Sequence, residues 1–381
     1  MTFGLPLDLQ NRVATADQWA RSTLAGRPCS AEFDAASWRG LSHFGLFRMA
    51  LPVSAGGEGL GALAVTAVLE ALGRGGADRG LLMAAGAHLF GCMLPLAAHA
   101  TAGQAARWLS ALRDGEVIGA LAVTERGGGS GFDQMATTAT ATPDGVVLRG
   151  RKTLVCNALH AGLFLVLARQ FPDRGAMGLT TFLVPRDAKG VAVEPIIPVA
   201  GLPGAAMGEL VLDGCSLPMD AILGRPGTGL RVFMTAMKWE RCGLLAGFIG
   251  AADRDLGVCA DALASRADGA LLRHQAVLHR MARMKVRLET ARLMLRRAAC
   301  SIDDGRDDHT ASAMAKFVVS EALVDCAQDV ARLLAGAGWR GTPFDSGAAL
   351  VDALGGLFAS GTSEIQLDLI ARSVLAEARP Q

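Results

Sequence analysis

The hydrophobic periodicity of this chain changes twice along its length, and that change limits the fold more than any other feature. Residues from about 6 to 116 carry apolar side chains at helical spacing, as in AVTAVLEALGR and GQAARWLSALRDG. From about 118 to 224 the pattern becomes that of strands, and from about 228 long helical patterns return. We therefore predict an α+β protein with an N-terminal helical domain (1–117), a middle β-sheet or β-barrel domain (118–226) and a C-terminal four-helix bundle (227–381).

Seven short segments in the middle region are predicted to be strands. They are rich in Val, Thr and Leu, and turn signals such as Pro143-Asp144-Gly145 separate them. The predicted strands are 118–125, 134–141, 145–156, 162–169, 179–186, 191–199 and 208–217. Their close spacing predicts one compact sheet domain between the two helical regions.

Charge and composition narrow the classes of function. The 51% of hydrophobic residues in 381 provide enough apolar material for a large core. Lys and Arg total 37 against 36 Asp and Glu, so no global field favours nucleic acid or an anionic membrane. A locally basic segment, 279–297, has apolar residues at helical spacing and is predicted to be an amphipathic helix with a solvated or subunit-facing side.

No pattern indicates a disulfide framework, a metal site or export. The eight cysteines are scattered without a CxxC pair, and the seven histidines form no HExxH. The first residues lack a basic segment followed by an apolar run, and no segment approaches about 18 uninterrupted apolar residues. We therefore expect a cytoplasmic protein with no membrane span and no metal.

Glu240 lies on the apolar face of the helix predicted after residue 228. Phe233, Met237, Leu244 and Phe248 recur at spacings of three and four, and Glu240 falls inside this stripe. A buried carboxyl group has a raised pKa, which suits a general base or acid. The alternative is that this face is partly exposed and that Glu240 pairs with a neighbouring basic residue.

Four segments together resemble one protein family. AVTERGGGSGFD resembles the TEPGAGSD signature of the acyl-CoA dehydrogenase family, and LRGRKTLVCNALHAGLFLVLAR resembles its second β-domain signature. GELVLDGCSLPMDAILGRPGTGLRVFMTAMKWER is similar to the family's passage into its long helices, and GTSEIQLDLIAR to its last signature. The resemblance is collinear and covers nearly the whole chain.

The resemblance implies a reaction and its partners. Family members hold FAD between the β domain and the C-terminal helices, and they oxidise a saturated acyl thioester to the 2-enoyl thioester. A carboxylate removes the α-proton while a hydride leaves to the flavin. The implied partners are acyl-CoA or an acyl-carrier protein, an electron-transferring flavoprotein or similar acceptor, and further subunits in a homotetramer or homodimer. A neighbouring subunit completes the adenine end of the cofactor site.

The same resemblance assigns roles to individual residues. Most members carry the base where this chain has Ser360, whereas the isovaleryl-type and long-chain-type members carry it in a Glu-Arg pair that matches Glu240-Arg241. Glu240 is therefore the implied base, and Ser130, Arg241 and Ser360 are the implied substrate contacts. The implied cofactor contacts are Leu121, Val123, Thr124, Gly129, Ser130, Leu154, Cys156, Arg266, Gln275, Gly336, Thr362 and Glu364.

Three positions depart from the family pattern. Leu154 stands where many members have a Trp stacked on the flavin, Cys156 where they have Thr or Ser, and Arg332 where they have Gln. A thiol is a weak hydrogen-bond donor, so Cys156 weakens the expected contact to the flavin ring. Two other functions therefore stay open: oxygen chemistry on a flavin in the same fold, and a non-redox binding or assembly role without cofactor.

Overall fold

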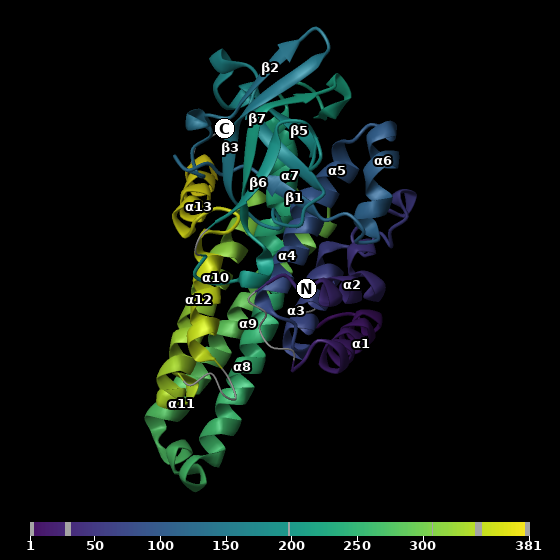
Figure 1. The fold of residues 1–381 in the computed structure, drawn as a ribbon. Helices are drawn as coiled ribbons and strands as arrows, with labels where there is room; N and C mark the ends of the chain where they lie inside the picture. Colours follow the sequence, from purple (N-terminus) through teal and green to yellow (C-terminus); the bar gives the residue numbers. More distant parts are fainter. Residues whose placement is uncertain (1–3, 27–31, 197–198, 307, 340–344, 378–381) are drawn as a thin grey trace.

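The protein is elongated, with a sheet domain at one end and long helices running toward the other. The computed structural model describes residues 4–26, 32–196, 199–306, 308–339 and 345–377. In Figure 1 the first N-terminal helices lie below the sheet, beside the upper part of the C-terminal helices, and the last two lie beside the sheet itself. These N-terminal elements are α1 (Leu7–Thr23), α2 (Ala35–Phe44), α3 (Ala62–Gly75), α4 (Arg79–Gly86), η3 (Ala87–Met93), α5 (Leu94–His99) and α6 (Ala102–Arg113).

The middle region forms one eight-stranded sheet, and all seven predicted strands are present in it. The strands are β1 (Gly119–Ala122), β2 (Thr138–Thr142), β3 (Gly145–Val155), β4 (Leu163–Arg169), β5 (Leu179–Pro185), β6 (Val191–Pro195), β7 (Gly208–Leu217) and β8 (Ile222–Leu223). Their order is β6-β7-β3-β2-β4-β5-β8, and β1 pairs with β4 in parallel. The prediction missed β8, because two residues are too short to show a periodicity. Residues 197 and 198 of the predicted strand 191–199 lie outside the described residues.

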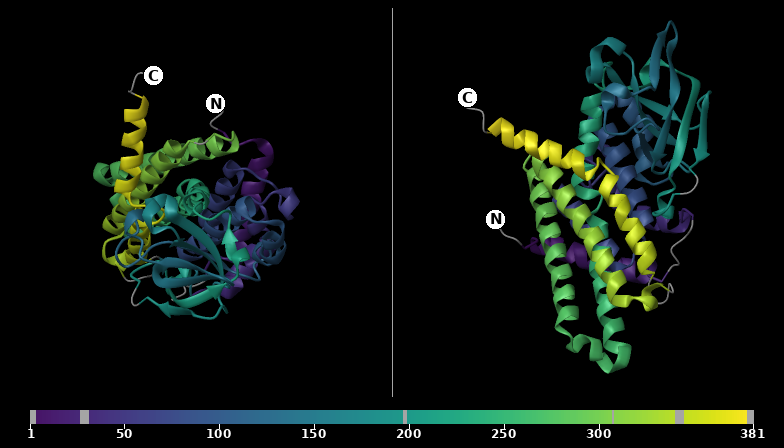
Figure 2. Two further views of the ribbon diagram at one scale, coloured as in Figure 1. Left: turned by 90° about the horizontal axis from the view of Figure 1, so that it is seen from above. Right: turned by 90° about the vertical axis from the view of Figure 1, so that its left-hand side faces the viewer.

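The C-terminal region is helical, as predicted. It contains α7 (Gly229–Gly243), α8 (Ala246–Ser265), η8 (Arg266–Arg273), α9 (Gln275–Asp303), α10 (His309–Leu334), α11 (Gly336–Trp339), α12 (Ser346–Phe358) and α13 (Ser363–Glu377). The amphipathic helix predicted over 279–297 lies within α9, where Met284, Leu288 and Leu295 are buried. Figure 2 shows α13 projecting away from the other helices, and only Ser363 and Gln366 of this helix are buried.

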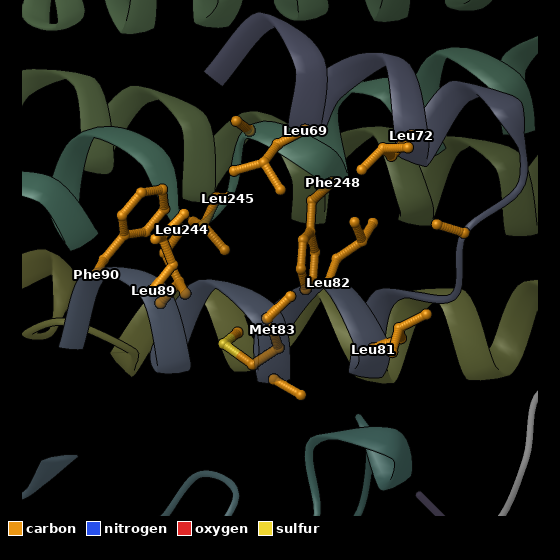
Figure 3. Packing of buried hydrophobic residues seen from close by; sticks show 14 of the residues in the cluster. Leu69, Leu72, Leu81, Leu82, Met83, Leu89, Phe90, Leu244, Leu245 and Phe248 are labelled. Carbon is orange, nitrogen blue, oxygen red and sulfur yellow. The ribbon is translucent and has the colours of Figure 1, made fainter. Parts of the chain in front are cut away.

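The two helical regions share one hydrophobic core. Glycines bring α3 and α8 into close contact, because a Cβ atom at Gly73 would lie 1.8 Å from the Gly247 carbonyl oxygen. Phe248, which is 0% exposed, lies in the same core, and burial of such a side chain contributes about 2 kcal/mol. Figure 3 shows this part of the core, with side chains from Leu69, Leu72, Leu81, Leu82, Met83, Leu89, Phe90, Leu244, Leu245 and Phe248.

One helical stretch, Arg79–His99, is long and apolar enough to cross a membrane. Of its most apolar window, 89% is buried inside the protein. The stretch comprises α4, η3 and α5, and its side chains contribute to the shared core. Its apolar character is thus accounted for by packing between the N-terminal and C-terminal helices.

Candidate active site

A cavity of about 370 Å³ lies where the sheet domain meets the helices. Its walls come from β1 and β3, the loop after β1, α4 and η3, α7, and the turn between α12 and α13. Eleven of the residues implied by the family resemblance line it: Leu121, Val123, Thr124, Gly129, Ser130, Leu154, Cys156, Glu240, Arg241, Ser360 and Thr362. The fold therefore gathers residues from four distant parts of the sequence around one space.

Glu240 is buried in the wall of this cavity. It is 8% exposed, which agrees with its place on the apolar stripe of α7 and excludes the alternative of an exposed face. The Ser360 hydroxyl donates a hydrogen bond of 2.8 Å to Glu240 Oε2. Burial raises the pKa of Glu240 to about 7, while the Ser360 hydrogen bond and the charge of Arg241 oppose the rise. Near neutral pH this carboxyl group can therefore accept and release a proton.

A glycine that the sequence pattern did not identify leaves room for the other carboxylate oxygen. Gly91 lies in η3, a π-helical segment inside the apolar stretch before the sheet. A Cβ atom at Gly91 would lie 2.6 Å from Glu240 Oε1, so a side chain there would require the carboxylate to shift. π-Helical turns often occur at functional sites. Here the turn places a residue without a side chain against the carboxylate.

Ser360 lies at the sharp turn that joins α12 to α13. Its φ is 56°, in the left-handed region that residues with a side chain seldom adopt. The backbone carbonyl of Ser360 accepts a hydrogen bond from Gln366 Nε2 at 3.3 Å, and the same nitrogen donates to the Gly361 carbonyl at 3.0 Å. These contacts help to hold the conformation that directs the Ser360 hydroxyl toward Glu240.

Arg241 also reaches the cavity, although successive residues point about 100° apart around a helix. Its side chain is buried, and its Nε lies 3.4 Å from the Ser360 carbonyl oxygen. Among the described residues, Arg241 Nη1 has no hydrogen-bond partner. Burial lowers the pKa of Arg241, and the negative charge of Glu240 opposes this. Arg241 thus offers an unused donor at the cavity wall.

The Gly-rich loop after β1 is fixed at its base by a buried ion pair. Lys152 is fully buried and donates to Glu125 Oε1 at 2.8 Å and to the Val123 carbonyl at 3.0 Å. The Glu125 carboxylate also accepts from the backbone N–H groups of Ala136 and Thr137, at 2.6 and 2.9 Å. Gly129 and Ser130 between these anchors are exposed at the rim of the cavity. The loop is therefore anchored at both ends and open to a ligand in the middle.

A β-bulge at the end of β3 turns two residues toward the cavity. The pairing of β3 with β7 shifts between Lys152 and Val155, so Thr153 and Leu154 stand opposite one residue, Glu209. Leu154 has a φ of 53° and is 49% exposed. Cys156 follows as a cavity residue, and burial raises the pKa of its thiol to about 12.

The start of α13 contributes a helix N-terminus to the cavity. Thr362 Oγ1 accepts a hydrogen bond of 3.3 Å from the Ile365 N–H, so Thr362 acts as the N-cap of α13. Glu364 lies one residue into the helix and is exposed. Unlike Thr362 and Ile365, it is not among the lining residues.

Three implied cofactor contacts lie away from this cavity. Arg266 opens η8, and its Nη1 donates to the Leu334 carbonyl at 3.3 Å. Gln275 opens α9, and Gly336 opens α11. Figure 1 places α11 and the α8–α9 connection at the end of the molecule opposite the sheet. The fold of one chain does not bring these three residues to the cavity lined by the other implied contacts.

Comparisons with known proteins identify the family. Three domain models match: acyl-CoA dehydrogenase N-terminal domain at residues 10–116, middle domain at 120–215 and C-terminal domain at 227–375. The chain is 36% identical over 352 residues to an L-prolyl-[peptidyl-carrier protein] dehydrogenase of Pseudomonas fluorescens, covering 92% of each protein.

Solved structures agree with this match. A structure described as "PigA with FAD and proline" is 30% identical with a TM-score of 0.93, covering 99% of this chain and 100% of that one. The prolyl acyl carrier protein oxidase AnaB is also 30% identical, with a TM-score of 0.92, covering 97% of this chain and 100% of that one. The matched domains span the N-terminal helices, the sheet and the C-terminal helices. The chain therefore belongs to the acyl-CoA dehydrogenase family.

Proposed function

We propose that this protein is an FAD-dependent dehydrogenase of acyl thioesters in which Glu240 removes the α-proton. One observation carries the proposal: a carboxyl group with a pKa of about 7 lines the cavity, between the space left by Gly91 and the hydroxyl of Ser360. A base that works near neutral pH needs a pKa close to that pH. The Ser360 hydroxyl holds Oε2 of Glu240, and Gly91 leaves room for Oε1, so the carboxyl group is oriented before substrate arrives.

The cavity has features that fit a flavin. Leu154 is exposed at the bulge and presents an apolar side chain that can pack on a flat ring. Cβ atoms at Gly127 and Gly128 would meet nothing within 4 Å, so the loop leaves space for the rest of the cofactor. Thr124, Leu154 and Thr362 would hold the ring, with Thr362 at the positive end of α13. When bound, FAD supplies the acceptor for the β-hydride.

We propose that the substrate is a prolyl group carried on the phosphopantetheine arm of a carrier protein. The buried side chains of Met83, Ala87 and Leu244 line the inner part of the cavity, which favours a short or cyclic acyl group. Two relatives named L-prolyl-[peptidyl-carrier protein] dehydrogenase, 36% and 32% identical to this chain, support a prolyl substrate. Ser130 and Arg241 are the proposed thioester-side contacts, and Arg241 has an unused donor there.

The test is the visible spectrum of the purified protein during anaerobic addition of prolyl-carrier protein. A yellow protein that bleaches with prolyl-carrier protein and not with butyryl-CoA would support the whole proposal. Bleaching by butyryl-CoA alone would refute the carrier-protein substrate and indicate an acyl-CoA substrate instead. A protein that stays colourless after incubation with FAD would refute the proposal that it binds a flavin. Adding either oxygen or an electron-transferring flavoprotein to the bleached protein then identifies the electron acceptor. Both are compared because AnaB is named an oxidase.

The role of Glu240 is tested by Glu240→Gln. The variant should keep bound FAD and lose bleaching by at least about 10²-fold, since general-base catalysis contributes that much or more. Glu116→Gln, which changes an exposed carboxylate outside the cavity, is the matched control and should bleach at the wild-type rate. Wild-type bleaching by Glu240→Gln with FAD bound would exclude Glu240 as the base.

We also propose that the protein works in the cytoplasm as a homo-oligomer in which a second copy covers α13. The seven described cysteines are free, which suits a reducing compartment. Leu367, Val374 and Leu375 of the projecting helix are 48–64% exposed, and a partner would bury them. A second copy would also let Arg266, Gln275 and Gly336 approach a cofactor bound to its neighbour. Light scattering of the wild type and of Val374→Asp tests this, and a monomeric wild type would refute it.

A further inference from the structure

A buried lysine lies behind the turn that carries Ser360. Lys316 of α10 is 2% exposed, and its Nζ donates a hydrogen bond of 2.8 Å to the Leu357 carbonyl. None of the described carboxylates forms a salt bridge with it. Burial lowers the pKa of Lys316 to about 8; Glu321 and Glu364 oppose this, and Arg241 adds to it. A lysine is seldom buried without a salt-bridge partner unless its contact matters.

The Leu357 carbonyl belongs to the last turn of α12. The final carbonyls of a helix have no partner within the helix and form its negative end, so an ammonium group is favoured there. Directly after Leu357 the chain runs through Phe358, Ala359, Ser360 and Gly361, all of which line the cavity. The lysine thus holds the helix end from which this turn departs.

A second cation contacts the same turn from another helix. Arg241 of α7 directs its Nε toward the Ser360 carbonyl at 3.4 Å, three residues after the carbonyl held by Lys316. Ser360, at the second of these contacts, has its backbone in the left-handed conformation. The Ser360 hydroxyl then reaches Glu240 Oε2 at 2.8 Å. The contacts form one continuous path from Lys316 through the turn to the carboxylate.

We propose that Lys316 is a positioning residue for the proton-transfer step: by holding the Leu357 carbonyl, it fixes the turn that presents the Ser360 hydroxyl to Glu240. This inference rests on the proposed role of Glu240 as base. Lys316 touches neither the cavity nor Glu240 directly, so its effect must pass through the 357–360 backbone. A purely structural lysine would instead affect folding without any specific effect on the Glu240–Ser360 hydrogen bond.

The test uses the pKa of Glu240 as its readout. Infrared difference spectra of the FAD-loaded enzyme, titrated with pH in the absence of substrate, report the protonation of the carboxyl group directly. The band is assigned by its loss in Glu240→Gln. The variants are Lys316→Met, Ser360→Ala and the double variant, with Lys316→Arg to restore a donor. Lys285→Met, which removes a half-exposed lysine of α9, is the matched control.

The Ser360 hydrogen bond lowers the pKa of Glu240, so its loss should raise that pKa by about one unit. We expect Lys316→Met and Ser360→Ala to produce the same rise and the double variant to add nothing further. Lys316→Arg should restore much of the wild-type value, and Lys285→Met should not change it. The acid limb of kcat/KM should move with the infrared pKa, while KM stays nearly constant.

Two results would overturn the proposal: a wild-type Glu240 pKa in Lys316→Met, or shifts that add in the double variant. If Lys316→Met does not fold, Lys316→Gln takes its place, because the Gln amide is polar but one bond shorter and cannot make the same contact. A Glu240→Gln enzyme with full turnover would instead refute the proposed function. The infrared shift in Lys316→Met tests the positioning role independently of that result.

Discussion

Replacing Gly91 by alanine tests how closely the backbone is fitted to the base. The added Cβ would lie 2.6 Å from Glu240 Oε1 and 3.3 Å from the Leu121 Cβ. The carboxylate must therefore retreat by about 0.8 Å to reach the 3.4 Å of ordinary contact. A misplacement of about 1 Å can reduce a rate by about 10²-fold, so we expect kcat to fall between about 10- and 100-fold.

The same substitution should have little effect on stability. Alanine is favoured over glycine within a helix by about 1 kcal/mol, which offsets part of the steric cost. The expected result is thus a folded, FAD-containing enzyme with a low kcat. Anaerobic stopped-flow bleaching at saturating thioester measures the rate, and thermal unfolding measures the stability.

Gly257→Ala is the control for this comparison. Gly257 also lies within a helix, α8, but its added Cβ would meet nothing within 4 Å. It should gain about 1 kcal/mol of stability and keep the wild-type rate. A Gly91→Ala enzyme that bleaches as fast as Gly257→Ala would refute the reasoning, because it would show that the carboxylate position does not limit the reaction.

Three further predictions concern buried ionisable groups. The pKa of Glu240 rises from 4.5 to about 7 on folding, so the free energy of unfolding of the wild type should fall by up to about 3 kcal/mol as pH rises through this range. Urea unfolding of Glu240→Gln and the wild type at pH 5 and 8 should show that the variant becomes relatively more stable at pH 8. The same difference in stability at both pH values would contradict this. Lys152→Met leaves the Glu125 carboxylate without its cation and should lower the free energy of unfolding by about 3 kcal/mol. The double variant Lys152→Met with Glu125→Gln should lose less stability, and equal losses in the two variants would show that the ion pair is unimportant. The Cys156 thiol, with its raised pKa of about 12, should react with iodoacetamide at pH 8 more slowly than the exposed Cys300. Mass spectrometry that shows equal alkylation of the two thiols in the folded protein would contradict this.

Local patterns in the sequence were sufficient to predict most helices and strands and the buried face of α7. Seven of the eight strands follow from short runs of Val, Thr and Leu, and the burial of Glu240 follows from apolar residues at spacings of three and four. These properties are local: the side-chain period of a segment records which face is buried, whatever packs against it. The motifs likewise identified eleven of the residues that line the cavity, because they mark segments whose backbone approaches a common space.

Only the tertiary structure decided which groups meet around the carboxylate. Ser360 reaches Glu240 across 120 positions of sequence, and the burial of Lys316 behind that turn left no local signal. The place of Gly91 beside Glu240 Oε1 depends on how η3 packs against α7, and the bulge at Leu154 depends on its register with β7. The sequence determined that a carboxyl group would be buried, because periodicity is local. Its partners, and hence its pKa, were decided by long-range packing, since hydrogen bonds between distant segments depend on the three-dimensional placement of whole elements.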